Sequence, residues 1–298
     1  MKQSTVAGIS PRGVGIPGFK PLAAALTHDI GLYQAPRLAL VAQFLQQYGG
    51  RRPIPVAEVL PVILMNYGEV EFHHAQTWFE ADEEAPGWSH GRPSLIDVGA
   101  GFGPAGLVFG SRHYAVTAIE LQPDIASMGE RVVQACGLET TVRYAVGDVM
   151  AFAPETPADT LIAVLCLLHV PDIVGVMRKL ATLLRAGGRA YLADFYAKGA
   201  ISAQEQALLQ DEVACPGLLT KDEYIGALQE AGFAIVRFKD VTSEYATFVH
   251  QRWTTYRQQD PAAQCDALTR FFKAMDTLYW SGDGSSSRLG GCRVYLER

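Results

Sequence analysis

The sequence predicts an α/β fold built on a doubly wound, Rossmann-like parallel sheet. From Ser94 onward, apolar strand-like runs alternate with stretches of helical periodicity, the pattern expected of such a sheet. One of these runs, Ser94–Val98, leads directly into a glycine-rich turn and then a helix start. With 298 residues, 49% of them hydrophobic and 19% charged, the chain has enough apolar side chains for a sizeable core.

The first 90 residues predict a helical cap over the cofactor edge of the sheet, acting as a lid, with the main domain spanning 91–298. Met1–Gly18 is rich in Gly, Ser and Pro and is expected to form a surface strap. Three helical stretches follow, of which the first is divided at Pro36 and the second is broken at Pro61: Pro21–Tyr48, Val56–Leu64 and Val70–Glu84.

The main domain is predicted from period and from turn residues. The helices begin at Pro or at a capping box and end at Gly, and a two-helix insertion covers 243–282. After Ser94–Val98, the predicted strands are His113–Glu120, Thr141–Val146, Thr160–Leu168, Arg189–Phe195, Phe233–Lys239 and Cys292–Leu296. The predicted helices are Pro123–Cys136, Pro171–Leu184, Thr220–Ala231, Ser243–Tyr256 and Ala262–Trp280.

The glycine turn, SLIDVGAGFGPAG, allows two cofactor interpretations. Gly101, Gly103 and Gly106 satisfy G-x-G-x-x-G, the pattern of dinucleotide sites, which favours NAD and an oxidoreductase. Alternatively, Asp97 precedes Gly99, Gly101 and Gly103 as an acid before G-x-G-x-G. A carboxylate at this strand end repels a pyrophosphate but attracts a cationic ligand. The second interpretation, S-adenosylmethionine (SAM), is therefore favoured.

Two further acids stand at predicted strand ends. Glu120 lies about 20 residues past the glycine turn, where a carboxylate accepts hydrogen bonds from ribose hydroxyls; a solvated strand end is the alternative. Asp148 follows the next strand and is predicted to receive the adenine amine, with Val149 offering its backbone N–H to the ring; an Asx turn is the alternative.

His169 follows the fourth strand, whose carboxyl end faces the ligand in doubly wound sheets. A neutral imidazole there can take a proton from an amine or hydroxyl acceptor, so His169 is the candidate general base, with simple packing as the alternative. The neighbouring His73 and His74 point to different faces of a helix, which argues against a metal site; no metal is expected.

At this point the sequence resembles class I SAM-dependent methyltransferases of the group acting on small molecules. The residues that carry the resemblance occur in family order: Asp97–Gly103, Glu120, Gly147–Asp148, the LLHVPD stretch and Leu184–Arg189. It implies a seven-stranded sheet with the final strand antiparallel. The insertion is similar to that of sarcosine and phosphoethanolamine methyltransferases.

The resemblance also implies the site residues and the reaction, a methyl transfer from SAM to an N, O or C atom of a small acceptor. The cofactor set is Asp97, Gly99, Gly101, Gly103, Glu120, Leu121, Asp148, Val149 and Cys166, and Tyr67, His74 and Trp253 are assigned to the acceptor. Cys166 and Cys215 also fall where arsenite methyltransferases bind arsenic, so an arsenite-type enzyme is an alternative. A further alternative is a regulatory or scaffold protein that keeps the SAM fold and its pocket but catalyses no reaction.

Composition excludes several classes. The net charge is −6 and no Lys/Arg run occurs, so a nucleic-acid partner is not expected. The sequence has no 18-residue apolar stretch and no apolar signal segment at its start, so neither a membrane span nor a secretory signal is expected. Five scattered cysteines without C-x-x-C favour reduced thiols in a cytoplasmic enzyme. The oligomeric state is open, with a homodimer as one option.

Overall fold

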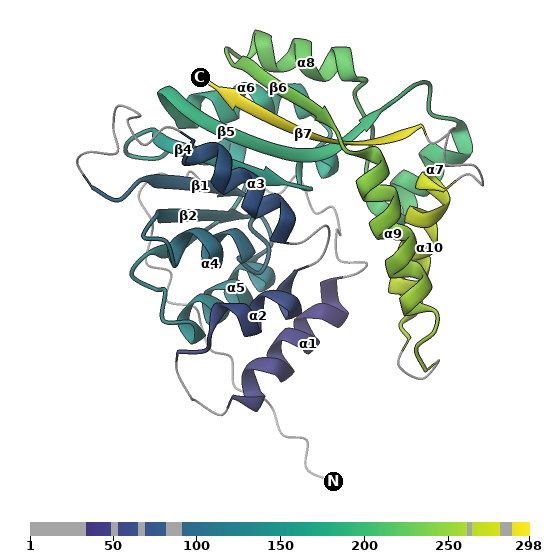
Figure 1. Ribbon diagram of the computed structural model, residues 1–298, viewed down its shortest axis with the longest axis horizontal. Coiled ribbons are helices and arrows are strands. Elements are labelled where there is room, and N and C mark those ends of the chain that lie inside the picture. The colour runs from purple at the N-terminus through teal and green to yellow at the C-terminus, as the bar shows by residue number, and fades with distance from the viewer. Residues whose placement is uncertain (1–33, 49–52, 65–68, 82–90, 261–263, 281–287) are drawn as a thin grey trace.

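The computed structural model describes residues 34–48, 53–64, 69–81, 91–260, 264–280 and 288–298. Its sheet has seven strands in the order β3-β2-β1-β4-β5-β7-β6, and β7 runs antiparallel to both of its neighbours (Figure 1). The predicted doubly wound sheet with an antiparallel final strand is thus confirmed. The strands are β1 (Ser94–Val98), β2 (Ala115–Glu120), β3 (Val142–Val146), β4 (Ala158–Val164), β5 (Leu184–Ala197), β6 (Ala234–Asp240) and β7 (Leu289–Glu297).

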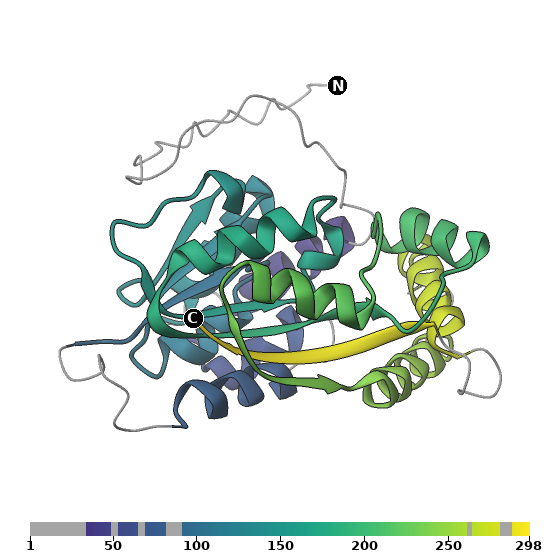
Figure 2. The same ribbon diagram turned by 90° about the horizontal axis from the view of Figure 1, so that it is seen from above.

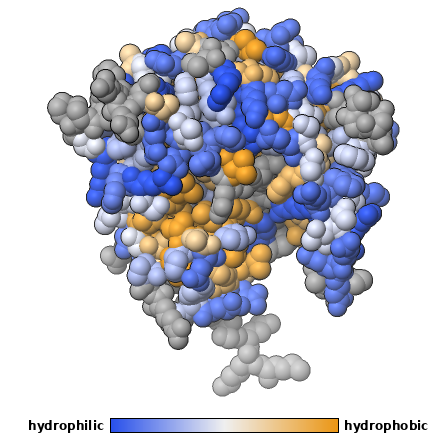
Figure 3. Space-filling model, viewed as in Figure 1, coloured by the Kyte–Doolittle hydropathy of each residue, from blue (hydrophilic) through white to orange (hydrophobic). Residues whose placement is uncertain are grey.

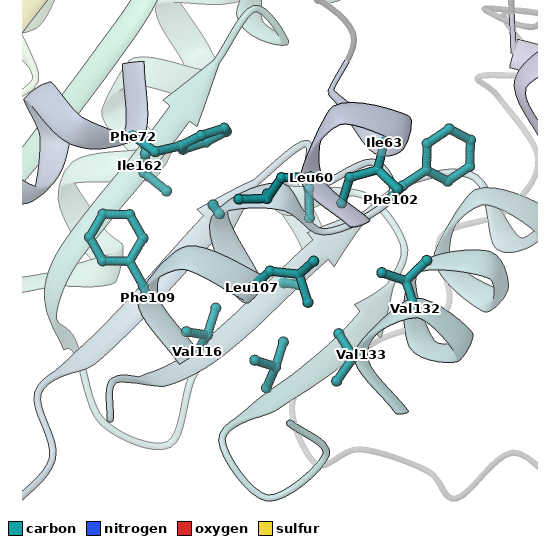
Figure 4. Close-up of a cluster of buried hydrophobic side chains, with 14 of the residues drawn as sticks. Leu60, Ile63, Phe72, Phe102, Leu107, Phe109, Val116, Val132, Val133 and Ile162 are labelled. Carbon is teal, nitrogen blue, oxygen red and sulfur yellow. The ribbon is translucent and has the colours of Figure 1, made fainter. Parts of the chain in front are cut away.

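Helices cover both faces because successive strand residues point to opposite sides. In β1, Leu95 joins one buried cluster and Ile96 joins the other. The Leu95 side packs under α3 (Glu69–Phe79), α4 (Pro104–Gly110) and α5 (Pro123–Ala135), and Figure 4 shows part of this cluster. The other side packs under α6 (Ile173–Leu183) and α8 (Lys221–Glu230), which lie above the sheet in Figure 2.

The N-terminal helices share the core of the sheet domain. α1 (Gln34–Gln47) packs on α5 and α2 (Val56–Ile63) packs on α4, while α3 contacts β4 and β5. Pro36 stands in the first turn of α1, and the part of the predicted first helix before Gln34 lies outside the described residues, as does Met1–Gly18. Pro61 lies inside α2 without ending it, since the proline is exposed and the helix continues to Ile63.

Two predicted strand boundaries differ from the structure. The strand expected over Thr160–Leu168 ends at Val164, because Leu165 takes a left-handed φ of +51° and a short 3₁₀ turn, η4 (Leu167–His169), follows. The strand expected over Arg189–Phe195 begins earlier, at Leu184, directly after α6, which ends at Leu183, within one residue of the predicted helix end. Gly187 is accommodated within β5 at φ +68°, its N–H bonded to the Arg298 carbonyl.

One helix, α7 (Ala203–Val213), was not predicted from the sequence. Its start carries a capping box in which Ser202 and Glu205 satisfy each other's backbone N–H groups. The same capping box at Thr220 and Glu223 predicts a helix, and α8 does begin there. In α7 it was missed because the helix has little amphipathic period, with few buried residues.

The predicted insertion is an antiparallel hairpin of α9 (Thr242–Tyr256) and α10 (Asp266–Tyr279). It packs against α7 and projects from the end of the sheet (Figure 1). On the face shown in Figure 3, the outer surface of this hairpin is mostly hydrophilic, whereas apolar residues gather over α2 and α4. The hairpin therefore turns its apolar face inward, toward Phe195 and Leu168 at the ends of β5 and η4.

A buried ion cluster connects α3, β7 and α9. Arg293, 2% exposed, donates to both Glu71 oxygens, with the shortest contact 2.7 Å, and also to Glu244 Oε2 at 2.7 Å. Tyr191 donates its hydroxyl to Glu71 as well, and Glu71 itself is fully buried.

Among the described residues, no helix is long and apolar enough to span a membrane.

Candidate functional site

A cavity of about 460 Å³ opens at the carboxyl ends of β1, β2, β3 and β4. This is where doubly wound sheets bind ligands, since the loops after parallel strands meet there. Of the residues predicted for the cofactor and for catalysis, those that line the cavity are Asp97, Gly99, Gly101, Glu120, Leu121, Asp148, Val149, Cys166 and His169. Segments far apart in the chain therefore contribute to one site.

The glycine turn forms the floor of this cavity, and two of its glycines are required by its geometry. Gly99 has a φ of +69°, and a Cβ there would lie 2.4 Å from the Cβ of Cys166. Gly103, predicted to bind the cofactor, is not part of the cavity wall; it caps α4 and packs against Tyr144, whose Oη would lie 2.5 Å from an added Cβ. Tyr144 also donates to the Gly101 carbonyl at 3.1 Å, which fixes the turn from behind.

Asp97 is the most unusual group in the cavity wall. Its side chain is 5% exposed, and its Oδ2 atom has no hydrogen-bond partner among the described residues. Burial, and secondarily the negative charge of Glu120, raise the pKa of Asp97 to about 7. A buried carboxylate with an unsatisfied oxygen is stabilised by a cation, so this position fits a positively charged ligand group.

Glu120 is held by its own backbone surroundings. Its Oε2 accepts from the Gly101 N–H and its Oε1 from the Gln122 N–H, each at 2.9 Å. Burial raises the pKa of Glu120, and these backbone hydrogen bonds oppose that rise. A carboxylate has about four lone-pair sites, so acceptor capacity for hydroxyl donors remains on Glu120 beside its backbone contacts.

Asp148 forms a turn of the kind expected as the alternative to adenine binding, and it also lines the cavity. Its Oδ1 accepts from the Met150 N–H at 2.9 Å, which caps a short 3₁₀ turn, η3 (Val149–Ala151). Beside it, Met150 is 43% exposed and Leu121 is 39% exposed, and both line the cavity. Exposed apolar side chains around a polar rim suit the faces of a flat heterocycle.

His169 stands in η4 with one ring nitrogen engaged. Its Nδ1 lies 3.1 Å from the Ala214 carbonyl oxygen. Because a carbonyl only accepts, Nδ1 carries the proton and Nε2 is left as a hydrogen-bond acceptor. Burial lowers the pKa of His169, so the imidazole is neutral at physiological pH and suited to accept a proton.

Asp194, at the end of β5, was not predicted from the sequence and supports η4 from below. It is 1% exposed, its Oδ1 accepts from the Phe195 N–H at 2.8 Å, and the nearby backbone of Leu167 and Leu168 in η4 also favours its charged form. Burial raises its pKa to about 7 despite these bonds. A single acid in a strand gives no sequence signal for such a role.

A second, smaller pocket of about 20 Å³ also has Leu165 and His169 in its wall. The other walls come from η4, β5, α7, α9 and α10 and are apolar except for Arg252. They are Leu168, Phe195, Val213, Phe248, Val249, Phe271, Phe272 and Met275. Since it shares two wall residues with the large cavity, this pocket adjoins the position where an acceptor would meet His169.

The acceptor residues predicted from the sequence are not brought together here. His74 lies beside the ion cluster, where burial and the charge of Arg293 lower its pKa, and Trp253 stacks near Tyr256 in α9. Neither is among the described residues that line the two cavities, and their assignment to the acceptor stays a prediction. Tyr67 lies outside the described residues.

The cysteines give no support to the arsenite alternative. Cys166 donates to the Val98 carbonyl and Cys215 to the Gly217 carbonyl, and burial raises the pKa of both thiols, so they stay protonated. Over the part of the chain that the structure describes, no group of three or more His, Cys, Asp or Glu side chains is placed to hold a metal ion.

Residues 71–237 match a family described as a methyltransferase domain. Among curated relatives, the methyltransferase GfsG of Streptomyces halstedii is 26% identical over 155 residues, 50% of this chain and 56% of the relative. The ubiquinone biosynthesis O-methyltransferase of Xanthomonas euvesicatoria is 34% identical over 102 residues, 33% of this chain and 41% of the relative. The chain thus spans about half the length of the curated relatives it matches.

Solved structures share the fold at low identity. A phosphoethanolamine N-methyltransferase 2 of Haemonchus contortus, solved with phosphomonomethylethanolamine and S-adenosylhomocysteine, superposes with a TM-score of 0.66 at 13% identity. The match covers 91% of this chain and 60% of that one. At this identity the likeness concerns the fold alone.

Proposed function

The chain belongs to the methyltransferase-domain family that matches its residues 71–237, as the motif order predicted, and on that premise we propose that it transfers a methyl group from SAM to a small acceptor molecule. The observation that carries the proposal is Asp97, a buried carboxylate with an unsatisfied oxygen in the wall of the large cavity. SAM is cationic at its aminoacyl and sulfonium end, and a dinucleotide pyrophosphate is anionic. Asp97 therefore supports SAM over NAD.

The residues present fit the rest of the cofactor. Glu120 retains acceptor positions for the two ribose hydroxyls, and Asp148 with the Val149 backbone stands on the next strand end, beside Leu121 and Met150, for the adenine ring. Cys166 packs against Gly99 and closes the wall behind the ligand. The predicted lid role of the first 90 residues is part of the proposal, supported by Ile63 and Phe72, which line the cavity from α2 and α3.

SAM supplies an activated methyl group when bound, so the protein mainly needs to align the acceptor and exclude water. His169 adds a neutral base, with Nδ1–H held by the Ala214 carbonyl and Nε2 able to take a proton from the acceptor. Asp194 fixes the η4 turn and with it the position of His169. The proposal also includes a cytoplasmic location and no nucleic-acid partner; all five cysteines are free of disulfides.

SAM binding near neutral pH is expected to release protons through Asp97. In the free protein its pKa is about 7, and a cation beside the carboxylate favours the charged form, so binding drives the proton off. At pH 7 we expect about half a proton released per SAM, growing toward pH 6. Calorimetry in buffers of different ionisation enthalpy measures this number, and Asp97→Asn should abolish it. Equal proton release by Asp97→Asn contradicts the assignment.

The raised pKa of Asp97 should also make the stability of the free protein depend on pH. Because the folded pKa of about 7 lies above the ordinary value of 3.8, the folded state binds the proton more tightly than the unfolded chain. Stability is therefore lost as pH rises from about 4 to about 7. The Asp97→Asn variant should show a flatter decline over that interval than the wild type in urea unfolding.

Glu120→Gln is expected to weaken SAM binding by about tenfold or more. The substitution removes hydrogen bonds to a carboxylate, worth about 1.5–3 kcal/mol, and sets an amide NH₂ against the backbone donors of Gly101 and Gln122. Isothermal titration with SAM measures the change. Glu139→Gln, at an exposed acid outside the cavity, is the control and should bind as the wild type does. Equal affinities of the two variants remove Glu120 from the site.

A further inference from the structure

The size and lining of the small pocket beside His169 indicate what kind of acceptor could enter it. It holds about 20 Å³ in this state, little more than one water molecule, which needs about 10–15 Å³. An acceptor that enters it must displace side chains of the α9–α10 hairpin. Phe248 lies at the opening of the pocket, since it lines the pocket and the residue is 37% exposed. The acceptor therefore replaces apolar contacts that the hairpin already makes.

The charges around this pocket oppose a cationic acceptor. Among the described residues that line it, none is a carboxylate, and Arg252 is the one permanently charged side chain. The Arg252 guanidinium lies 4.9 Å from the ring centroid of Phe272 and 5.8 Å from that of Phe248. Those aromatic faces are already covered by the Arg252 guanidinium, so they do not form a cage for a second cation such as an ammonium group.

The same walls are poor for a phosphorylated acceptor. Phosphate recognition uses several donors, such as paired arginines or a helix N-terminus with a lysine. Neither cavity offers another Lys or Arg among its described lining residues besides Arg252. On the opposite side of the large cavity, Ile63 of α2, Leu64 directly after it and Phe72 of α3 add apolar side chains. The carboxylates that line this cavity are those assigned above to the cofactor, together with Asp172, which caps α6.

We propose that the acceptor is an apolar, ring-bearing hydroxyl compound, neutral or weakly acidic, whose ring enters between η4 and the α9–α10 hairpin. This rests on the proposed methyl transfer and names its substrate class. His169 Nε2 takes the hydroxyl proton while the acceptor oxygen forms a bond to the methyl carbon. The carbon–sulfur bond breaks with its electron pair on sulfur, which becomes a neutral thioether, and His169 later returns the proton to solvent.

Naphthol and naphthylmethylamine test this class, because they share a ring system and differ in the charge of the polar group. Each is titrated into the wild-type protein saturated with S-adenosylhomocysteine. We expect naphthol to bind at least about tenfold more tightly, and sarcosine and phosphoethanolamine not to compete with it. Equal or tighter binding of the amine overturns the proposal, as does competition by either polar acceptor.

A pair of variants locates the binding. Phe248→Ser makes the mouth of the pocket polar at a partly exposed site that the fold tolerates, and we expect naphthol to bind about tenfold more weakly. Leu40→Ser makes the same kind of change at a 50% exposed position of α1, outside both cavities, and should leave binding unchanged. Unchanged naphthol affinity in Phe248→Ser overturns the proposal.

The two proposals fail separately. If S-adenosylhomocysteine does not bind, the proposed methyltransferase function is wrong, and the pocket is then judged by naphthol binding to the protein alone, with the same two variants. If S-adenosylhomocysteine binds and naphthol does not, the cofactor assignment stands and the acceptor class is wrong.

Discussion

Replacing His169 by Asn should lower kcat by about 10²–10⁴-fold for any acceptor whose methylated atom loses a proton, while leaving SAM affinity close to that of the wild type. Asn is chosen because its amide nitrogen occupies the place of Nδ1 and can still donate to the Ala214 carbonyl. The variant therefore keeps the contact that holds η4 and removes only the basic Nε2. Steady-state kinetics with saturating SAM, together with a SAM titration, measures both quantities.

The pH dependence of kcat separates a base from a structural histidine. Burial lowers the pKa of His169, and the neutral form is the active one. The wild-type rate should hence be level at neutral pH and fall only as the pH drops below the ordinary range of histidine, near 6.5. His169→Asn should lack this acid limb. A variant with wild-type kcat and the same limb shows that His169 is not the base.

Stability distinguishes the remaining alternative, in which His169 serves only to pack η4. In that case His169→Asn retains activity and His169→Ala lowers the melting temperature, because the ring fills space between the two cavities. If His169 is the base, both variants lose kcat to a similar degree and only the alanine variant melts earlier. The kcat values and melting temperatures of the two variants together show whether His169 is a base or only a packing residue.

The local motifs in this sequence were informative because their geometry depends on neighbours along the chain. Asp97 and Glu120 come at the ends of strands, and strand order then places them together at one edge of the sheet. The sequence places His169 at the same edge for the same reason, since it follows β4. The positive φ values of Gly99 and Gly101 are likewise local properties that the glycine pattern predicts.

Other parts of the site depend on packing between distant segments. Asp194 acts on Leu167 and Leu168, which nothing in the sequence near Asp194 indicates. The predicted acceptor roles of His74 and Trp253 rest on residue type alone, whereas the rotation of α3 and α9 about their axes decides which face each helix presents to the cavity. That rotation is set by contacts such as Glu71 with Arg293, which are 222 positions apart.

That ion cluster gives the largest expected effect on stability. Arg293 is 2% exposed, and Glu71 is fully buried with two arginine nitrogens and the Tyr191 hydroxyl around it. Replacing Arg293 by Met keeps the apolar volume of the stem but leaves the Glu71 carboxylate buried without a counter-charge. We expect a loss of about 3–5 kcal/mol in the free energy of unfolding, measured by urea denaturation.

The double variant Arg293→Met with Glu71→Gln shows whether the loss comes from the unpaired charge. Without a buried carboxylate, much of the stability should return, because replacing a whole buried pair is far less costly than removing one partner. Lys239→Met is the matched control: it removes the exposed contact of Lys239 with Glu244 at 3.1 Å on the rim of the same cluster and should cost under about 1 kcal/mol. If Arg293→Met costs no more than Lys239→Met, the buried pair does not hold α3 against the sheet, and the position of Phe72 in the cavity wall needs another cause.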